Sequence, residues 1–492
     1  MTIDIDTVES PGWWLNWLSR KLISRNEEIT KLFARYENEH QIPEALRDAP
    51  ESARRFFKAA RTAFGEMIVK SVKYPLKVST VLTAVDSGDL GDNVAWRIFS
   101  GSGMEEESDD VHRLAVLAGN SYGIVQWHEA TQSWRYTSED PRQVITQHDP
   151  TVQSETIAAA KFYHDPIRKE ARATLWTVDR TYYAYREQSS PRGYARFSPS
   201  WNWDPEYGGA EGLAREVYPD LSRIPVFRYR NEEGVGEFKR HLPILDRIEH
   251  MVLDGMTIAT YQAFKQRAIK VNSKDMPEYD PKTGNRIDYD EIFSSDPGAL
   301  WRIPETANIW ESGQVDLTPV WTGIDKAIQQ LAAVTFTPLA MFAPEGQNQS
   351  AAGSSFAREG RTFKIEDRQD RFAQTHAKAL ALLFALNDDA DRASPEDIEI
   401  VWRPAERHSM TEKTASLINS GAMPWQARME EIMQFSPRKI ERMKRMRDED
   451  ALFEATYAEP AEGGPTPPDD EADAPANEDV DSEPDTADIT IS

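Results

Sequence analysis

One short run in the chain matches a catalytic sequence pattern. The residues GNSYG at positions 119–123 have the form G-x-S-x-G, which in hydrolases holds a nucleophilic serine between a strand and the helix that follows it. Around Ser121 the order is reversed, because an apolar helical run precedes it and the strand-like run Tyr122–Trp127 follows it. We therefore interpret Gly119 as the end of a helix and keep a serine hydrolase using Ser121 as an alternative.

Other catalytic and metal-binding patterns do not occur in the sequence. There is no G-x-x-x-x-G-K-[ST] phosphate loop, so we expect no ATP hydrolysis by this chain. His128-Glu129 lacks the second histidine of H-E-x-x-H, and the nine histidines show no metal-ligand spacing. The chain contains no cysteine, which excludes disulfides and thiolate metal sites. The sequence therefore predicts a protein that is not an enzyme and needs no cofactor.

The chain is strongly acidic, with a formal net charge of -25 over 492 residues. Residues 457–492 contribute twelve acids and no Lys or Arg, which leaves -13 on the rest. An acidic body weakens the grip on DNA, because binding by counterion release needs cations at the phosphates. We expect the proline-rich acidic tail to be disordered. No apolar run reaches about 18 residues, so no membrane contact is expected.

The hydrophobic pattern predicts an α+β protein. Apolar residues at helical spacing indicate two helices over residues 13–36 and one helix over 52–74. Alternating segments between about 122 and 185 indicate a small antiparallel sheet, and the Ser-, Pro- and Gly-rich stretch 187–212 should be irregular.

Two long helices are predicted in the middle of the chain, over residues 243–264 and 319–336, with Thr318 as the N-cap of the second. A loop of small, mostly uncharged residues follows at 338–355, then a very long helix, a strand at 397–404 and two helices at 411–420 and 425–457, the latter broken near Pro437. The apolar side chains expected to pack the first two helices together are Ile248, Val252, Ile324, Ile328 and Leu331.

Four segments in this order carry a resemblance to a known family. They are YENEHQIPEALRD, EDPRQVITQHDP, IPVFRYRNEEGVGEFKRHLPILDRIEHMV and VWTGIDKAIQQLAAVTFTPLAMF. Together with the helices and strands predicted between them, these segments resemble the portal, or head-tail connector, proteins of tailed double-stranded DNA bacteriophages, in particular siphophages that infect actinobacteria. The resemblance extends from about Trp13 to Tyr457.

The resemblance implies the phage portal fold, whose parts are named wing, stem, clip and crown, in a ring oligomer. It assigns them as wing 1–235, first stem helix 236–264, clip 265–314, second stem helix 315–336, tunnel loop 337–355, long wing helix and strand 356–408, crown helices 409–457 and acidic tail 458–492. The Trp- and Gly-rich segment 201–212 has no role in this scheme.

The same resemblance implies two sets of contact residues. The tunnel loop would face DNA through neutral hydrogen-bonding groups that steady a duplex without gripping it, and its residues are Glu345, Gln347, Asn348, Gln349 and Ser350. The clip would meet an acidic partner or DNA through Lys270, Lys274, Lys282 and Arg286, although an ordinary solvated surface explains these four equally well.

The implied function is structural. A dodecameric ring, assembled in the host cytoplasm and placed at one capsid vertex of the virion, would let double-stranded DNA pass during packaging and ejection without sequence specificity. The implied partners are the terminase large subunit, a head-completion or adaptor protein, and the major capsid and scaffolding proteins. Another minor capsid or adaptor protein is the second alternative, beside the hydrolase.

Overall fold

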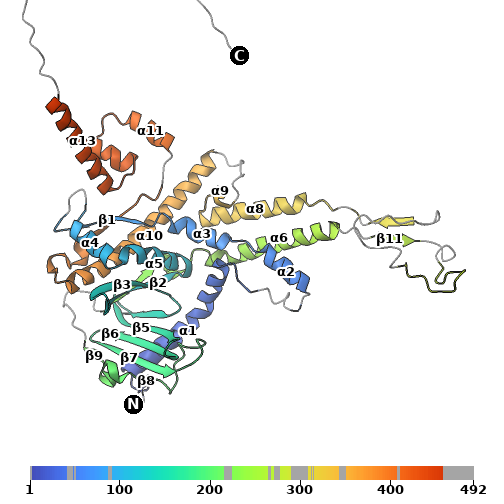
Figure 1. Cartoon of the computed structure of the whole chain (residues 1–492), viewed down its shortest axis with the longest axis horizontal. Coiled ribbons are helices and arrows are strands. Elements are labelled where there is room, and N and C mark those ends of the chain that lie inside the picture. Colours follow the sequence, from blue (N-terminus) through green and yellow to red (C-terminus); the bar gives the residue numbers. More distant parts are fainter. Residues whose placement is uncertain are drawn as a thin grey trace, which may run out of the picture. The chain divides into compact units, whose positions relative to one another are not determined.

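The computed structural model describes residues 3–41, 48, 51–86, 91–214, 224–263, 267–270, 277–289, 308–311, 313, 315–342, 351–406 and 410–457. Helices and antiparallel strands together make an α+β protein, which confirms the predicted fold class (Figure 1). The chain divides into two compact units, Met1–Glu441 and Arg442–Ser492.

The first helix, α1 (Pro11–Tyr36), is continuous. The Ser10 hydroxyl accepts a hydrogen bond from the Trp13 backbone N–H at 3.2 Å, and Pro11 occupies the first turn, where its missing N–H is not needed. The prediction of two helices here was wrong. Residues 20–30 contain neither Pro nor Gly, so nothing in the backbone breaks the helix.

The single helix predicted over residues 52–74 is instead two, α2 (Glu51–Ala60) and α3 (Phe64–Lys73). The residues between them make tertiary contacts in place of helical ones. Arg61 donates to the backbone carbonyls of Asn38 and His40, and the Thr62 N–H donates to the Glu249 carboxylate at 2.9 Å. The Thr62 N–H, which a continuous helix would have paired with its own backbone, is satisfied by this tertiary contact instead.

The strands are β1 (Val78–Thr83), β2 (Asn120–His128), β3 (Ser133–Glu139), β4 (Val144–His148), β5 (Thr156–Asp165), β6 (Glu170–Thr177), β7 (Arg180–Glu187), β8 (Asn202–Trp203), β9 (Leu213–Ala214), β10 (Val226–Arg230), β11 (Arg267–Lys270), β12 (Asn308–Glu311) and β13 (Ile398–Trp402). One sheet has the order β10-β2-β3, and a larger one has the order β4-β5-β6-β7-β8 with β9 also on β7. β1 pairs with β13 and β11 with β12. The predicted sheet and the predicted strand at 397–404 are confirmed.

The Trp-rich segment that had no predicted role completes the core of the larger sheet. Trp201 is fully buried and Trp203 is 8% exposed. The Trp201 ring meets Phe162 edge-on, with ring centroids 6.3 Å apart. Both tryptophans belong to the same buried cluster as Leu15 and Leu18 of α1. The segment therefore helps to hold this sheet against the first helix.

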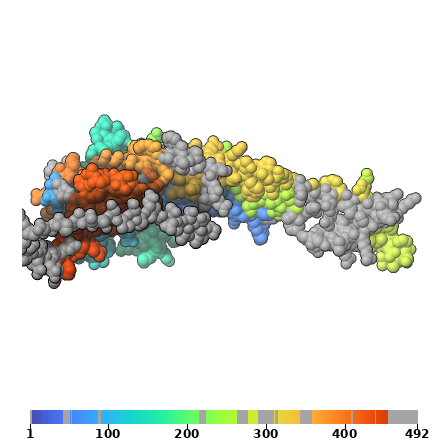
Figure 2. All heavy atoms as spheres, turned by 90° about the horizontal axis from the view of Figure 1, so that it is seen from above, coloured from blue at the N-terminus to red at the C-terminus, as the bar shows by residue number. Residues whose placement is uncertain are grey.

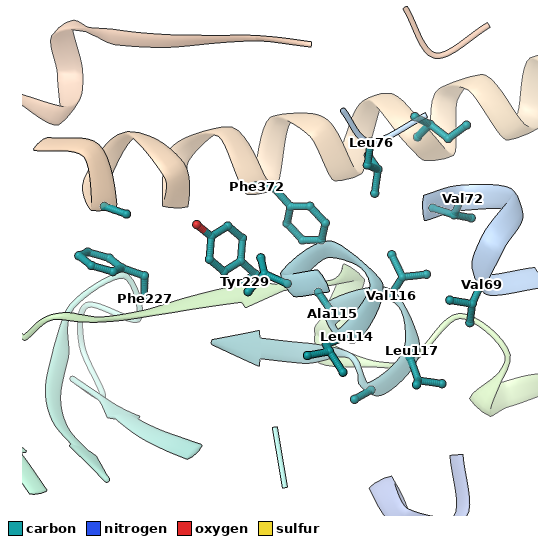
Figure 3. Packing of buried hydrophobic residues seen from close by; sticks show 14 of the residues in the cluster. Val69, Val72, Leu76, Leu114, Ala115, Val116, Leu117, Phe227, Tyr229 and Phe372 are labelled. Atoms are coloured by element: carbon teal, nitrogen blue, oxygen red, sulfur yellow. The ribbon is translucent and has the colours of Figure 1, made fainter. Parts of the chain in front are cut away.

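The main core packs against one long helix. α10 (Ala351–Leu386) packs over α5 (Met104–Ala118), α3 and β10, and α4 (Asn93–Gly101) adds Phe99 to the same cluster. Figure 3 shows Phe372 of α10 above Tyr229 and the apolar residues of α5. α5 ends at Gly119, whose φ is +84° and where a Cβ would lie 2.2 Å from the Gly234 carbonyl oxygen. The predicted helix end at this glycine is confirmed.

The loop predicted at 338–355 is shorter than expected. α9 (Leu339–Phe342) is helical, and α10 begins at Ala351, five residues before the predicted start. The correction has a simple cause, because Ala351 and Ala352 favour a helix and no proline follows them. The proposed DNA-facing residues Glu345, Gln347, Asn348, Gln349 and Ser350 lie outside the described residues.

The C-terminal helices follow β13. They are α11 (Met410–Asn419), α12 (Trp425–Ala427) with a π-helical turn over Arg428–Ile432, and α13 (Pro437–Tyr457). The predicted break near Pro437 is confirmed, since α13 starts at this proline. Residues 458–492, including the predicted disordered tail, lie outside the described residues.

Two fully buried histidines connect α5 to α10. His112 Nδ1 lies 3.1 Å from the Leu76 carbonyl oxygen, which can only accept, so Nδ1 carries the proton. His112 Nε2 then accepts from His376 Nε2 at 2.8 Å, and His376 Nδ1 accepts from the Tyr229 hydroxyl at 2.9 Å. Each hydrogen bond fixes the direction of the next, and the chain is complete only with both rings neutral.

The buried histidine pair predicts acid sensitivity. Burial lowers the pKa of His112 to about 4 and that of His376 well below 6.5. The unfolded chain therefore binds more protons than the folded one between pH 6.5 and about 4, so stability falls as the pH is lowered through this window. Urea unfolding across it should show a smaller pH dependence in a His112→Gln/His376→Gln variant. Equal pH dependence in both proteins would contradict the assignment.

Candidate functional site at the paired helices

Two long helices run side by side and are joined at one end by a β-ribbon. α6 (Leu242–Ala263) leads into β11, which pairs with β12, and the chain returns through α8 (Thr318–Thr335). Figure 1 shows the pair with the ribbon at its end, and Figure 2 shows the surfaces of α8 in yellow, α6 in green and α2 in blue lying along one another. Both long helices were predicted, and both are confirmed.

The two helices are antiparallel and closely packed. Arg247 near the start of α6 donates to Gln330 near the end of α8 at 2.5 Å, and Gln262 at the end of α6 donates to the Val315 carbonyl at 2.7 Å. Gly323 permits the close approach, because a Cβ there would lie 2.6 Å from Met251 Cε. This close packing makes the pair of helices stiffer than either helix would be alone.

The predicted packing residues lie along this contact. Ile248, Ile324 and Leu331 are buried, while Val252 and Ile328 are half-buried against the same cluster. One detail of the prediction was wrong: α8 begins at Thr318, which is therefore not its N-cap. Asp316 Oδ1 accepts the Thr318 N–H at 2.9 Å and supplies the oxygen that the threonine was expected to provide.

A buried carboxylate anchors α6 to the N-terminal helices. Glu249 is 2% exposed, and its Oε2 accepts from Arg35 Nη1 at 2.6 Å and lies 2.8 Å from His40 Nε2. Its Oε1 accepts the Thr62 N–H at 2.9 Å. Arg35, at the end of α1, also pairs with Asp246 one turn earlier on α6. One carboxylate thus joins α6, α1 and the α2–α3 connection.

A second buried carboxylate ties the pair to α10. The Glu237 side chain, just before α6, is 4% exposed and lies 2.6 Å from Lys364 Nζ and 3.1 Å from Arg368. Lys364 also donates to the Thr335 carbonyl at the end of α8, at 3.0 Å. One lysine of α10 therefore holds both the end of α8 and the segment that leads into α6.

Each anchor keeps its carboxylate ionised. Burial by itself would raise the pKa of Glu237, but Lys364 and Arg368 outweigh it and hold the pKa below 4.5. Burial likewise opposes ionisation of Glu249, and the hydrogen bonds from His40, Thr62 and Arg35 lower its pKa. A charged group stays buried only when it is paired in this way.

Sequence reasoning missed both anchors. Glu249 lies next to Ile248 on the apolar stripe of its helix, four residues after Leu245 and three before Val252. An acid on an apolar face must find a partner or lose its charge. The position of Glu249 on the apolar stripe was therefore a signal in the sequence. Its partner, Arg35, is 214 residues away in the chain, so no local pattern identifies it.

The predicted clip residues are only partly described. Lys270, on β11, and Lys282 and Arg286 are exposed, while Lys274 lies outside the described residues. Asp280 accepts the Lys282 N–H and the Thr283 hydroxyl, each at 2.8 Å, and so closes the Asp-Pro-Lys-Thr-Gly turn at residues 280–284. Lys282 and Arg286 thus lie near one turn, whereas Lys270 lies on β11.

The geometry does not support the hydrolase alternative. Ser121 is fully buried in β2, and its Oγ donates to the Val111 carbonyl at 2.6 Å. No metal-binding group of three His, Asp or Glu side chains occurs in the described part of the chain. Among the helices of the described residues, none is both long and apolar enough to cross a lipid bilayer.

A family of known proteins accounts for most of the chain. A family model described as "Phage portal protein, SPP1 Gp6-like" matches residues 16–451. The class that fold and sequence define is thus the phage portal proteins. The chain belongs to the SPP1 Gp6-like family within that class. A search of curated proteins found no match.

Solved structures give more distant likenesses. The virion of a native gene transfer agent (GTA) particle contains a chain 12% identical, with a TM-score of 0.42, covering 78% of this chain and 93% of that one. The neck of the native GTA particle, computed with C12 symmetry, gives 11% identity, a TM-score of 0.41 and coverages of 77% and 92%. An HK97 family portal protein from Corynebacterium diphtheriae is 12% identical, with a TM-score of 0.29, and the match covers 78% of this chain and 99% of that one. These likenesses are too distant to assign roles to residues.

The Glu249 anchor should carry a large share of the stability of the helix pair. Replacing Glu249 by Gln removes the buried partner of Arg35 and leaves it only the exposed Asp246, which we expect to lower the free energy of unfolding by about 3 kcal/mol. Asp254→Asn, at an exposed position of the same helix, should change it by less than about 0.5 kcal/mol. Urea unfolding at neutral pH measures both.

The same comparison has a pH signature. Because the folded-state pKa of Glu249 lies below its ordinary 4.5, its contribution is complete above pH 4.5 and is lost as the pH falls through the lowered value. The difference between Glu249→Gln and the unmodified protein should therefore shrink in acid. A loss no greater than that of Asp254→Asn would contradict the anchor.

Proposed function

We propose that this protein is the portal vertex subunit of a tailed phage of the siphophage type that infects actinobacteria. Copies of the chain, twelve by the resemblance, form a ring whose channel carries double-stranded DNA during packaging and ejection. The protein acts as a structural part of the virion and not as an enzyme. The observation that carries this proposal is membership of the portal family over residues 16–451.

The paired helices support this function mechanically. A channel wall must keep its shape while a stiff duplex moves past it. α6 and α8 are closely packed along their contact, and Glu249 and Glu237 hold them to α1, to the α2–α3 connection and to α10. We assign the pair to the stem, the β11–β12 ribbon to the clip and residues 337–355 to the tunnel loop.

Exposed aromatic side chains support contact with a neighbouring subunit. Phe363 of α10 is 63% exposed, and Phe336, at the end of α8, is 52% exposed. The Phe336 ring lies against Gly360, one turn from Phe363, because a Cβ on that glycine would come within 2.6 Å of it. Large apolar groups exposed close together are typical of surfaces that a partner covers, and a closed ring gives each subunit two complementary faces.

The proposed partners follow from the position of a portal. The terminase large subunit would dock during packaging and a head-completion or adaptor protein afterwards. Lys270, Lys282 and Arg286 are exposed and available for an acidic partner or DNA. The major capsid and scaffolding proteins would surround the ring when it is built into the capsid.

Negative-stain electron microscopy of the purified protein tests the proposal directly. We expect rings with a central hole. Phe363→Ser should reduce the fraction of rings, because it removes apolar area from the subunit contact. Ile167→Ser, which changes a 90% exposed residue at the turn between β5 and β6, is the matched control and should leave the rings intact. Only monomers and small oligomers of the unmodified protein at high concentration would overturn the proposal.

A second test concerns the loop that would face DNA. Replacing Gln347 and Gln349 by Lys adds positive charge at the phosphates and should slow or stall packaging, because each cation adds a salt-dependent attraction. Rings should still form. The neutral variant Gln347→Asn/Gln349→Asn should package normally. Unchanged packaging by the lysine variant, measured as DNA protected from nuclease, would remove the loop from the channel.

A further inference from the structure

α13 carries its charges in two blocks. Six of the ten residues from 438 to 447 are Lys or Arg, and Glu441 is the one acid among them. The acids of the helix gather later, beginning with the run at 448–450, and its first turn contains none. No other ten-residue stretch of this acidic chain has as many basic residues.

This arrangement opposes the helix dipole. The N-terminal end of a helix has a partial positive charge, so acids stabilise it there and bases destabilise it. α13 has the reverse order. Where a sequence breaks a local rule in this way, a compensating interaction is expected elsewhere. The dipole acts mainly on the first turn, where Arg438 and Lys439 lie, so the arrangement points to an anionic group near the start of the helix.

Three of the six basic residues are regularly spaced along the helix. Lys439, Arg442 and Arg445 follow one another at three-residue spacing on α13, and all three are exposed. The Lys439 ammonium lies 3.4 Å from the centre of the Phe435 ring, which leaves it at the helix surface near the start of the stripe. The result is a basic surface, defined by these three residues, on a protein whose net charge is -25.

The chain contains an anion of the right size next to this surface. Residues 458–492 follow directly on Tyr457, with twelve acids and no base. The distance along the helix from Tyr457 back to Lys439 is about 27 Å at about 1.5 Å per residue. The tail has 35 residues, and a peptide chain can extend by up to about 3.3 Å per residue. The tail can therefore reach the whole basic surface without any change in α13.

We propose that residues 458–492 bind the basic surface of α13 in the same chain. Because the tail is tethered, its effective concentration at the helix is about millimolar, which favours this contact over one with a separate molecule. The contact is electrostatic, so it weakens as salt screens the charges. Its consequence is that the surface is covered against other polyanions, including DNA. The proposal does not depend on the portal function, since it needs neither a ring nor a channel.

Zero-length carbodiimide crosslinking of the full chain tests the contact. The reagent joins a lysine to a carboxylate that touches it, and mass spectrometry identifies the pair. We expect Lys439 to crosslink to tail carboxylates about tenfold more than Lys58, an exposed lysine on α2, and high salt to remove the difference. Equal crosslinking to Lys58 would overturn the proposal.

Mixing isotopically light and heavy protein separates the two arrangements of the tail. Crosslinks within one chain carry a single label, as the proposal requires. Crosslinks that combine both labels in statistical proportion would show that the tail binds a second copy, which would overturn the same-chain contact.

Nucleic acid is the alternative ligand of the basic surface, and a binding measurement distinguishes it from the tail. In one variant of the full-length chain, every Asp and Glu of the tail is replaced by Asn or Gln. We expect this variant to bind a short DNA duplex about tenfold more tightly than the unmodified chain does. Adding Arg442→Gln/Arg445→Gln should abolish this gain, while Arg54→Gln/Arg55→Gln on α2 should not. Equal binding of the duplex with and without the tail charges would show that the tail does not occupy the helix.

Discussion

A carboxylate removed from water must find partners, and Glu237 and Glu249 find theirs on different helices. Glu249 needs Arg35 of α1 and the Thr62 N–H, while Glu237 needs Lys364 and Arg368 of α10. A small shift of α6 along either neighbour would separate charges that are almost completely buried, at a cost of several kcal/mol for each. The position of the helix pair is therefore fixed by charge as well as by apolar packing.

α10 connects this constraint to the rest of the larger unit. Along its length Lys364 and Arg368 hold the base of the pair, Phe372 lies in the main core, and His376 joins the histidine chain to α5. These contacts follow one another at about one helical turn. A force on the helix pair thus reaches the core through one continuous helix.

Periodicity predicted the elements whose apolar faces are regular. The two long helices, the antiparallel sheet, the helix end at Gly119 and the strand at 397–404 all follow from local patterns. The break between α2 and α3 did not, because Arg61 and Thr62 bind groups distant in sequence. The same reason hid the His112–His376 pair, which lies 264 residues apart. The packing residues of the helix pair were named from their stripe, whereas its ionic anchors needed the tertiary structure, and the DNA-facing loop stays a prediction.

The larger sheet ends in two very short strands, and this has a consequence for crowding. β8 and β9, of two residues each, both pair with β7 and occupy the edge that β7 would otherwise present. An exposed row of backbone N–H and C=O groups invites strands of other molecules to add to it. β8 and β9 are too short to offer such a row. Many copies of this chain can therefore gather at high local concentration with this edge protected from strand-to-strand aggregation.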